Sequence, residues 1–355
     1  MQKNPLFVLG IWRSGTSLLY AMLNQHPDIK LLYESDLPLL WPLFLSPARS
    51  SWAERVDFWN GALRRHRIDP QMLPASVDLG TAFESMARQY AESRGARIWG
   101  CKSPNYYNMV PRLAQEFPNA RYIFLWREPK EICASVTRAA RNSFWFSRRG
   151  MLRRVLFGCE MLRRACERLQ DSGRPVHELY YSDLVEHPER ELHQICRFLG
   201  IPFVSAMTTL EGADLSAVFN GDHHNILKNS DEARRQSNPP GEDASNSLYQ
   251  KIERYHGVWH SRFPNWRLAC GQQTPLTPGR WEECVDRLTF RALCAADQFR
   301  RWLFAFLPLS CWRTYRRLRY EDEDRYIQSP ALIEAIVGPR CTVSASPHRV
   351  SKLRD

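Results

Sequence analysis

A glycine-containing segment near the start of the chain has the residue types and spacing to bind a phosphate. Gly10-Ile-Trp-Arg-Ser-Gly-Thr-Ser17 follows a short apolar run at 6–9 and precedes a segment, 16–25, with helical apolar spacing. This order predicts a strand, a glycine loop and a helix. Backbone N–H groups of such a loop, together with the N-terminus of the next helix, bind phosphate whatever the side chains are. On spacing alone, an ordinary strand–helix turn is the alternative.

The side chains of this loop differ from those of a nucleotide triphosphatase. That class carries Lys where this chain has Thr16. The lysine serves the outer phosphates of a triphosphate, and a downstream Asp helps to hold magnesium. The chain lacks the lysine, and no apolar run ends in a convincing metal-holding Asp. It offers Arg13, Ser14, Gly15, Thr16 and Ser17 instead, which suit an anion of lower charge held without a metal.

Strands and helices alternate through the first 200 residues. Such alternation predicts an α/β, P-loop-type doubly wound fold whose mainly parallel sheet is flanked by helices. The predicted strands are 6–9, 96–100, 121–127 and 176–184, and the main predicted helices are 16–25, 111–117, 129–141, 150–170 and 188–201.

The remainder of the chain has a different composition. Residues 229–247 are polar and read as a loop or linker, and beyond 272 the sequence predicts helices rich in Arg and Trp. The last residues, from 338, are expected to be disordered. We therefore divide the chain into a main domain, 1–268, and a helical C-terminal extension, 269–355.

Composition narrows the classes of partner. Apolar content of 44% and charged content of 25% are normal for a folded protein, and the net charge of +11 favours an anionic partner. The ten cysteines show no zinc spacing, so we expect most of them to be buried thiols in a reducing compartment. The first apolar run ends in the glycine loop, which predicts no signal peptide and a cytoplasmic location.

Four stretches resemble, in order, the sulfotransferases that use 3′-phosphoadenosine 5′-phosphosulfate (PAPS). The resemblance is strongest to the protein-tyrosine sulfotransferases and their bacterial relatives, and it spans residues 5–203. The stretches are GIWRSGTSLLYAMLNQHPDI, GCKSPNYY, FLWREPKEICASV and YYSDLVEHPERELHQICRFLGIPF.

The resemblance implies a nucleotide site. The glycine loop would hold the 5′-phosphosulfate, while Arg127 and Ser135 would hold the 3′-phosphate that distinguishes PAPS from ATP. A planar guanidinium suits that phosphate. Tyr181 would pack on or bond the adenine edge, or else belong to the core. A partial match, HHNILK, adds Lys228 as a late ligand.

The resemblance also implies the catalytic groups. Arg13 and Lys102 would stabilise the leaving phosphate, because fixed cations placed where negative charge develops lower the barrier. Glu34 falls where the protein-tyrosine sulfotransferases place their catalytic glutamate, so it is the expected general base. His26 competes for that role, but its His-Pro context reads as scaffolding that ends a helix.

Basic and aromatic residues remain outside these motifs. The helix predicted at 150–170 carries five arginines, and Arg148 and Arg149 directly precede it. These seven arginines form either a solvated face or an electrostatic funnel for an anionic ligand. Residues 300–319 are too short and interrupted to span a bilayer. They could lie at an anionic membrane surface or form a buried helix. No recognisable motif supports binding to nucleic acid.

The sequence therefore predicts a cytoplasmic sulfotransferase that moves a sulfuryl group from PAPS to a hydroxyl, without a metal. The acceptor could be tyrosine, carbohydrate, lipid or a small alcohol. One alternative is a P-loop kinase-like phosphotransferase, against which the missing lysine argues. The other is a non-catalytic basic protein that binds nucleic acid or a membrane.

Overall fold

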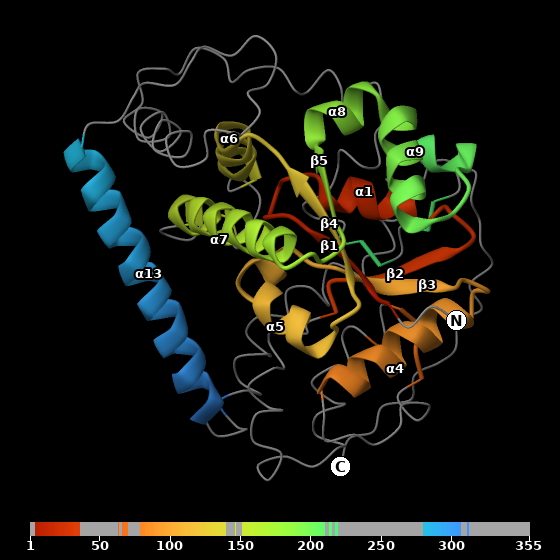
Figure 1. The fold of residues 1–355 in the computed structure, drawn as a ribbon, viewed down its shortest axis with the longest axis horizontal. Coiled ribbons are helices and arrows are strands. Elements are labelled where there is room, and N and C mark those ends of the chain that lie inside the picture. Colours follow the sequence, from red (N-terminus) through yellow and green to blue (C-terminus); the bar gives the residue numbers. More distant parts are fainter. Residues whose placement is uncertain are drawn as a thin grey trace, which may run out of the picture.

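The protein contains one parallel β-sheet covered by helices on both faces (Figure 1). The computed structural model describes residues 4–35, 63, 66–69, 79–139, 146, 151–209, 213–214, 217–218, 280–306 and 311. Predicted site residue Lys228 and the boundary drawn at 268/269 lie outside these residues.

Five strands form the sheet, in the order β2-β3-β1-β4-β5, and every neighbouring pair is parallel. The strands are β1 (Leu6–Leu9), β2 (Ile29–Tyr33), β3 (Ile98–Lys102), β4 (Arg121–Trp126) and β5 (Val176–Tyr180). Parallel strands that are buried on both faces carry nearly continuous apolar runs, which explains why β1 and β4 were recognisable in the sequence.

Helices connect the strands and cover both faces of the sheet. They are α1 (Thr16–Leu23), α4 (Leu79–Glu92), α5 (Val110–Glu116), α6 (Pro129–Ala139), α7 (Met151–Asp171), α8 (Tyr181–Glu186), α9 (Pro188–Leu199) and α13 (Arg280–Phe306), with 3₁₀ helices η3 (Pro104–Asn108) and η4 (Ser205–Thr208).

Two apolar cores lie on opposite sides of the sheet. One contains Phe7 and residues of α4, α5 and α7, and the other contains Leu6 and residues of α1 and α9. Successive residues of β1 therefore face different cores, as the two-residue period of a strand requires. This arrangement confirms the predicted doubly wound α/β fold.

Several predicted elements differ from the structure. β2 and α4 were not predicted, and β3 begins two residues later than expected, so Lys102 is its last residue rather than part of a turn. The predicted strand 176–184 ends at Tyr180, and α8 begins at Tyr181. The reason is pairing: β4 ends at Trp126, which aligns with Tyr180, so a longer β5 would have no neighbour there.

Helix α13 lies at the outer edge of the molecule (Figure 1). Phe290, Leu293 and Cys294, near its middle, pack against the core that contains α7. The Phe290 ring lies 5.4 Å from that of Phe157, and the Arg164 guanidinium lies over it at 4.4 Å. None of the described helices combines the length and the apolar character needed to cross a bilayer.

Candidate active site

The carboxyl ends of all five strands meet at one edge of the sheet, and most predicted site residues lie there. The glycine loop follows β1, Glu34 follows β2, Lys102 ends β3, Arg127 follows β4 and Tyr181 follows β5. Open parallel sheets bind ligands outside the carboxyl ends of their strands, where the strand order reverses. Here the chain crosses from the β2–β3 side of β1 to the β4–β5 side.

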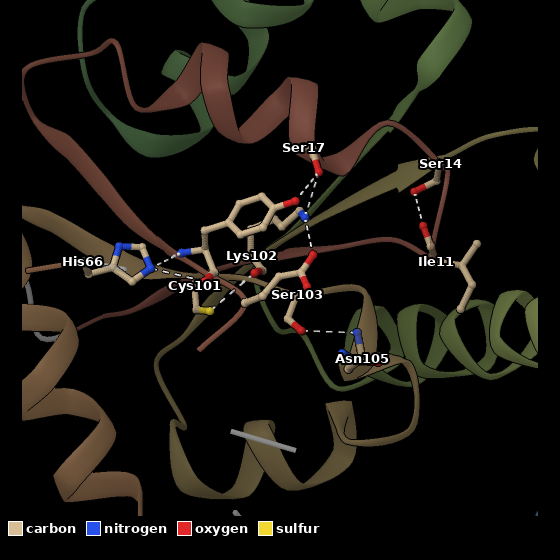
Figure 2. Close-up of polar contacts among 10 residues, drawn as sticks. Ile11, Ser14, Ser17, His66, Cys101, Lys102, Ser103 and Asn105 are labelled. Carbon is tan, nitrogen blue, oxygen red and sulfur yellow. Dashed lines mark hydrogen bonds and ion pairs between the residues drawn. The ribbon is translucent and has the colours of Figure 1, made fainter. Parts of the chain in front are cut away.

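The glycine loop has the backbone geometry of an anion site. Gly15 is the N-cap of α1 and has a φ of 98°, in the left-handed region that favours glycine. A glycine cannot cap the helix with a side chain, so the first N–H groups of α1 remain suited to an anion. Ser14 donates its hydroxyl to the Ile11 carbonyl at 2.7 Å, which closes the loop internally (Figure 2).

Lys102 is buried at the centre of a polar cluster. Its side chain is 1% exposed, and its Nζ donates to Ser17 Oγ and to Glu34 Oε1, both at 2.9 Å. Figure 2 shows the amino group directed at Ser17, in the first turn of α1. Burial lowers the pKa of Lys102, and the nearby Glu34 carboxylate opposes this shift. A cation is thus fixed beside the glycine loop.

Glu34 combines an unusual backbone with an accessible carboxylate. Its φ is 48°, which non-glycine residues rarely adopt. Its backbone N–H donates to the Lys102 carbonyl at 2.7 Å, so the β2–β3 pairing holds this conformation. The side chain is 17% exposed while it contacts Lys102. Strained backbone conformations of this kind are concentrated at functional sites, which supports the predicted catalytic role.

Tyr33 completes this cluster, and the sequence analysis missed it. The Tyr33 and Ser17 hydroxyls lie 2.8 Å apart, and Lys102 Nζ lies 3.8 Å from the centre of the Tyr33 ring. The ring therefore offers a π face to the ammonium group. A tyrosine in an apolar strand is usually a core residue, so the sequence held no signal that distinguished it.

A second cluster lies where α6 meets the glycine loop. Arg13 Nε donates to Ser135 Oγ at 3.1 Å, and Arg127 Nη1 donates to the Arg13 carbonyl at 3.1 Å. Arg127 Nε also binds Glu131 Oε2 at 3.0 Å, and the Arg127 side chain is 12% exposed. The two residues predicted to hold the 3′-phosphate thus lie together, and Arg13 joins them.

Tyr181 links this second cluster to the loop. The Arg127 guanidinium lies 4.2 Å from the centre of the Tyr181 ring. A Cβ added at Gly15 would lie 2.3 Å from Cδ2 of that ring, so only glycine permits the contact. Tyr181 is half-buried rather than a fully buried core residue. Its position on the loop and beside Arg127 is compatible with the predicted contact to a nucleotide.

His26 has a structural environment. Its ring is buried, Nε2 lies 2.8 Å from the Pro202 carbonyl, and Nδ1 accepts from the Asp28 N–H at 3.0 Å. Both ring nitrogens thus bind backbone groups, as expected for a residue that stabilises the end of α1.

The arginines of α7 do not form a simple solvated face. Arg163 binds Glu178 at 2.7 Å and lies over the Trp126 ring, while Arg154 lies over the ring of Trp12 in the glycine loop. Arg154 therefore adds positive charge near the loop. In the part of the chain that the structure describes, no group of three or more His, Cys, Asp or Glu residues is arranged to hold a metal ion.

A parallel sheet, a glycine loop that opens a helix, and cations at the neighbouring strand ends define an α/β protein whose strand-end loop has a geometry suited to a phosphate-type anion. Comparison with models of known protein families identifies the family to which this protein belongs. The sulfotransferase family model matches residues 5–205, more than half of the chain. The protein therefore belongs to the sulfotransferase family.

Two curated proteins and one solved structure are similar to parts of this chain. Protein-tyrosine sulfotransferase A of Caenorhabditis elegans is 26% identical over 246 residues, which are 66% of this chain and 58% of that protein. Protein-tyrosine sulfotransferase 1 of Danio rerio is 27% identical over 207 residues, covering 57% and 54%. The matched regions thus span little more than half of these relatives. The sulfotransferase domain from the curacin biosynthetic pathway has a TM-score of 0.49 at 20% identity, covering 75% of this chain and 99% of that domain.

Proposed function

We propose that this protein transfers a sulfuryl group from PAPS to a hydroxyl acceptor. The observation that carries the proposal is the pairing of a lysine-free glycine loop with two flanking clusters. One contains Lys102 and Glu34, and the other contains Arg127 and Ser135. Together they provide an anion site, a fixed cation, a candidate base and a second phosphate site.

The residues present fit the donor. The Gly15 N-cap and the α1 N-terminus suit the 5′-phosphate, and the Arg127–Ser135 cluster suits the 3′-phosphate. PAPS supplies a sulfuryl group already activated by its bond to phosphate. Arg127 now binds Glu131 and the Arg13 carbonyl. We expect the guanidinium to exchange its Glu131 contact for the 3′-phosphate, because charge-assisted contacts to phosphate are stronger than exposed ion pairs.

Glu34 and Lys102 would then carry out the chemistry. Glu34 would take the proton of the acceptor hydroxyl, because its carboxylate is partly open to solvent and therefore to an incoming substrate. Lys102 places positive charge beside Ser17, at the loop that holds the leaving phosphate. Tyr33 holds the ammonium group in that position through its π face. Arg13, which contacts Ser135, would bridge the two phosphate sites.

The same proposal covers the class of the acceptor and the cellular location of the protein. The names of two relatives make a tyrosine hydroxyl the first acceptor to test, followed by carbohydrate, lipid and small alcohols. A cytoplasmic location is supported by the free, buried thiols of Cys101, Cys133, Cys159, Cys166 and Cys196, which suit a reducing compartment.

The direct test is transfer of labelled sulfate from PAPS to tyrosine peptides, oligosaccharides and extracts, in the presence of EDTA. The proposal predicts labelled product with the wild-type protein and almost none with Lys102→Met. Transfer of phosphate from Mg-ATP without sulfate transfer would instead identify a phosphotransferase. Anion binding without any transfer, across all these acceptors, would favour a binding protein.

A further inference from the structure

The outward face of α13 carries apolar side chains that the catalytic proposal does not use. Trp281 is 77% exposed, Leu288 is 59% exposed and Phe299 is 61% exposed. Large apolar residues grouped on one exposed face mark an interaction surface. We define the α13 seam as the six exposed residues Trp281, Val285, Leu288, Ala292, Ala295 and Phe299.

The spacing of the seam is that of a coiled coil. Its members follow one another at intervals of four, three, four, three and four residues, and the sequence continues the pattern with Trp302 and Phe306. Two apolar positions in seven form the narrow stripe that pairs with another helix. A helix that lies in a lipid surface normally has a broader apolar face. Leu303, which is 44% exposed, lies one turn beyond Phe299 and outside this spacing. The regular part of the stripe suits a second helix, and a membrane surface is the alternative that the vesicle experiment below tests.

The seam points away from the body of the protein. Phe290, Leu293 and Cys294 pack against the α7 side, and they occupy the opposite face of the same helix. Figure 1 shows α13 along the outer edge of the fold. The contacts of Phe290, Leu293 and Cys294 therefore do not obstruct the approach of a second helix to the seam.

The order of residues in the seam is compatible with self-pairing in the antiparallel direction. Positions 292 and 295 are equidistant from the point midway between residues 293 and 294, as are positions 288 and 299. An antiparallel pair centred there sets Ala292 against Ala295 of the second copy, and Leu288 against Phe299. Two small residues then meet at the centre, with larger residues on either side. The four–three spacing reads the same in both directions, so it allows antiparallel pairing, and we choose this register because it places the two small residues together at its centre.

The available surface is of the right order for a stable dimer. A helix of 27 residues is about 40 Å long. From their exposure, Trp281 and Phe299 alone offer roughly 250–300 Å² per copy, about a third of the ~800 Å² per partner in a stable interface. The remaining seam residues and the polar flanks can supply the rest.

We propose that the α13 seam is the interface of a homodimer in which the two α13 helices pack antiparallel. In this dimer each active site is formed by one copy alone, at the carboxyl edge of that copy's sheet. The dimer follows the symmetry of an isologous interface, since each seam contacts the same seam of the second copy.

The first test measures mass in solution with the full chain. Sedimentation equilibrium should give twice the 41.5 kDa of one chain. Leu288→Glu should raise the dimer dissociation constant at least about a hundredfold, because it buries an unpaired charge in the interface. Gln298→Glu is the matched control, since it adds the same single negative charge at an exposed position of α13 outside the seam and should leave the dimer intact.

The second test measures direction by cross-linking, with Cys270→Ser, Cys284→Ser, Cys311→Ser and Cys341→Ser as background. A mixture of Leu288→Cys and Phe299→Cys chains should form a disulfide, and neither variant should do so alone. Cross-linking of each variant with itself would overturn the antiparallel arrangement.

A wild-type chain that is monomeric at all concentrations would overturn the dimer. A monomer that pellets with phosphatidylserine vesicles, and fails to do so with Leu288→Glu, would assign the seam to a membrane instead.

Discussion

The carboxyl edge of the sheet and the outward face of α13 are opposites in how they place side chains. At the sheet edge, the charged Lys102 is buried and held by Ser17 and Glu34. On α13, the apolar Trp281 and Leu288 face solvent. Folding stability alone favours neither placement, because burying charge and exposing large apolar surface both cost free energy. Each region is therefore best explained by a molecule that binds there.

The two regions differ in the kind of molecule they fit. The sheet edge offers several cations and directed donors, so it suits an anion by charge and geometry. The α13 seam offers apolar area at regular spacing, so it selects a second helix. The following substitutions test whether chemistry and association are separate properties of these two regions.

The largest expected effect comes from Glu34→Gln. The amide keeps the shape of the side chain but cannot accept a proton, so turnover should fall on the order of 10²–10⁴-fold. Binding of 3′-phosphoadenosine 5′-phosphate should persist. Steady-state kinetics and calorimetry measure the two properties.

Two variants serve as controls for this prediction. Glu131→Gln removes the carboxylate that binds Arg127, and it should leave turnover at saturating donor within about tenfold, since no base is lost. His26→Asn should lower the melting temperature more than the turnover, because its ring binds two backbone groups. A folded, inactive His26→Asn beside an active Glu34→Gln would reverse the assignment.

Arg127→Ala should weaken nucleotide binding. It removes a charge-assisted contact worth ~1.5–3 kcal/mol, so the affinity for 3′-phosphoadenosine 5′-phosphate should fall about 10–150-fold. The affinity for ADP, which lacks the 3′-phosphate, should change much less. Ser135→Ala removes one neutral donor and should have a smaller effect in the same direction. Equal losses for both nucleotides would place Arg127 outside the 3′-phosphate site.

The pH dependence of turnover tests the role of Lys102. Burial lowers the pKa of Lys102, so the ammonium group loses its proton at a lower pH than an ordinary lysine. If the charged form is needed, activity should fall with rising pH below the usual range for lysine. Lys102→Arg stays charged and should move this alkaline fall to higher pH, even if maximal turnover is reduced. An unchanged alkaline limb in Lys102→Arg would show that another group is responsible.

The smallest effect on chemistry is expected from the seam. Leu288→Glu should leave turnover and donor affinity within about twofold of wild type while it abolishes the dimer, because distant sites contribute independently. Activity that declines together with dimer dissociation would show that the two regions are coupled.

The sequence predicted the site in two ways. The glycine loop was recognised from the spacing of a few neighbouring residues, whereas Arg127, Ser135 and the candidate base Glu34 were predicted through the resemblance of their segments to sulfotransferases. The fold class followed from alternating strands and helices. These features require no knowledge of which strands are neighbours.

Contacts between distant segments were beyond the sequence. The position of Tyr33 beneath the Lys102 ammonium group depends on β2 pairing with β3, and the contact of Arg13 with Ser135 depends on β4 lying beside β1. Similarly, the sequence indicated a helical region rich in Arg and Trp beyond residue 272. Only the packing of Phe290 against the body shows which face of α13 remains outside.

The most direct test of the central claim compares two nucleotides by calorimetry. The lysine-free loop and the Arg127–Ser135 cluster predict that 3′-phosphoadenosine 5′-phosphate binds in the presence of EDTA. It should bind at least about tenfold more tightly than Mg-ATP binds in magnesium buffer, from the one additional charged contact. Equal or tighter binding of Mg-ATP would contradict this account of the site and favour a phosphotransferase.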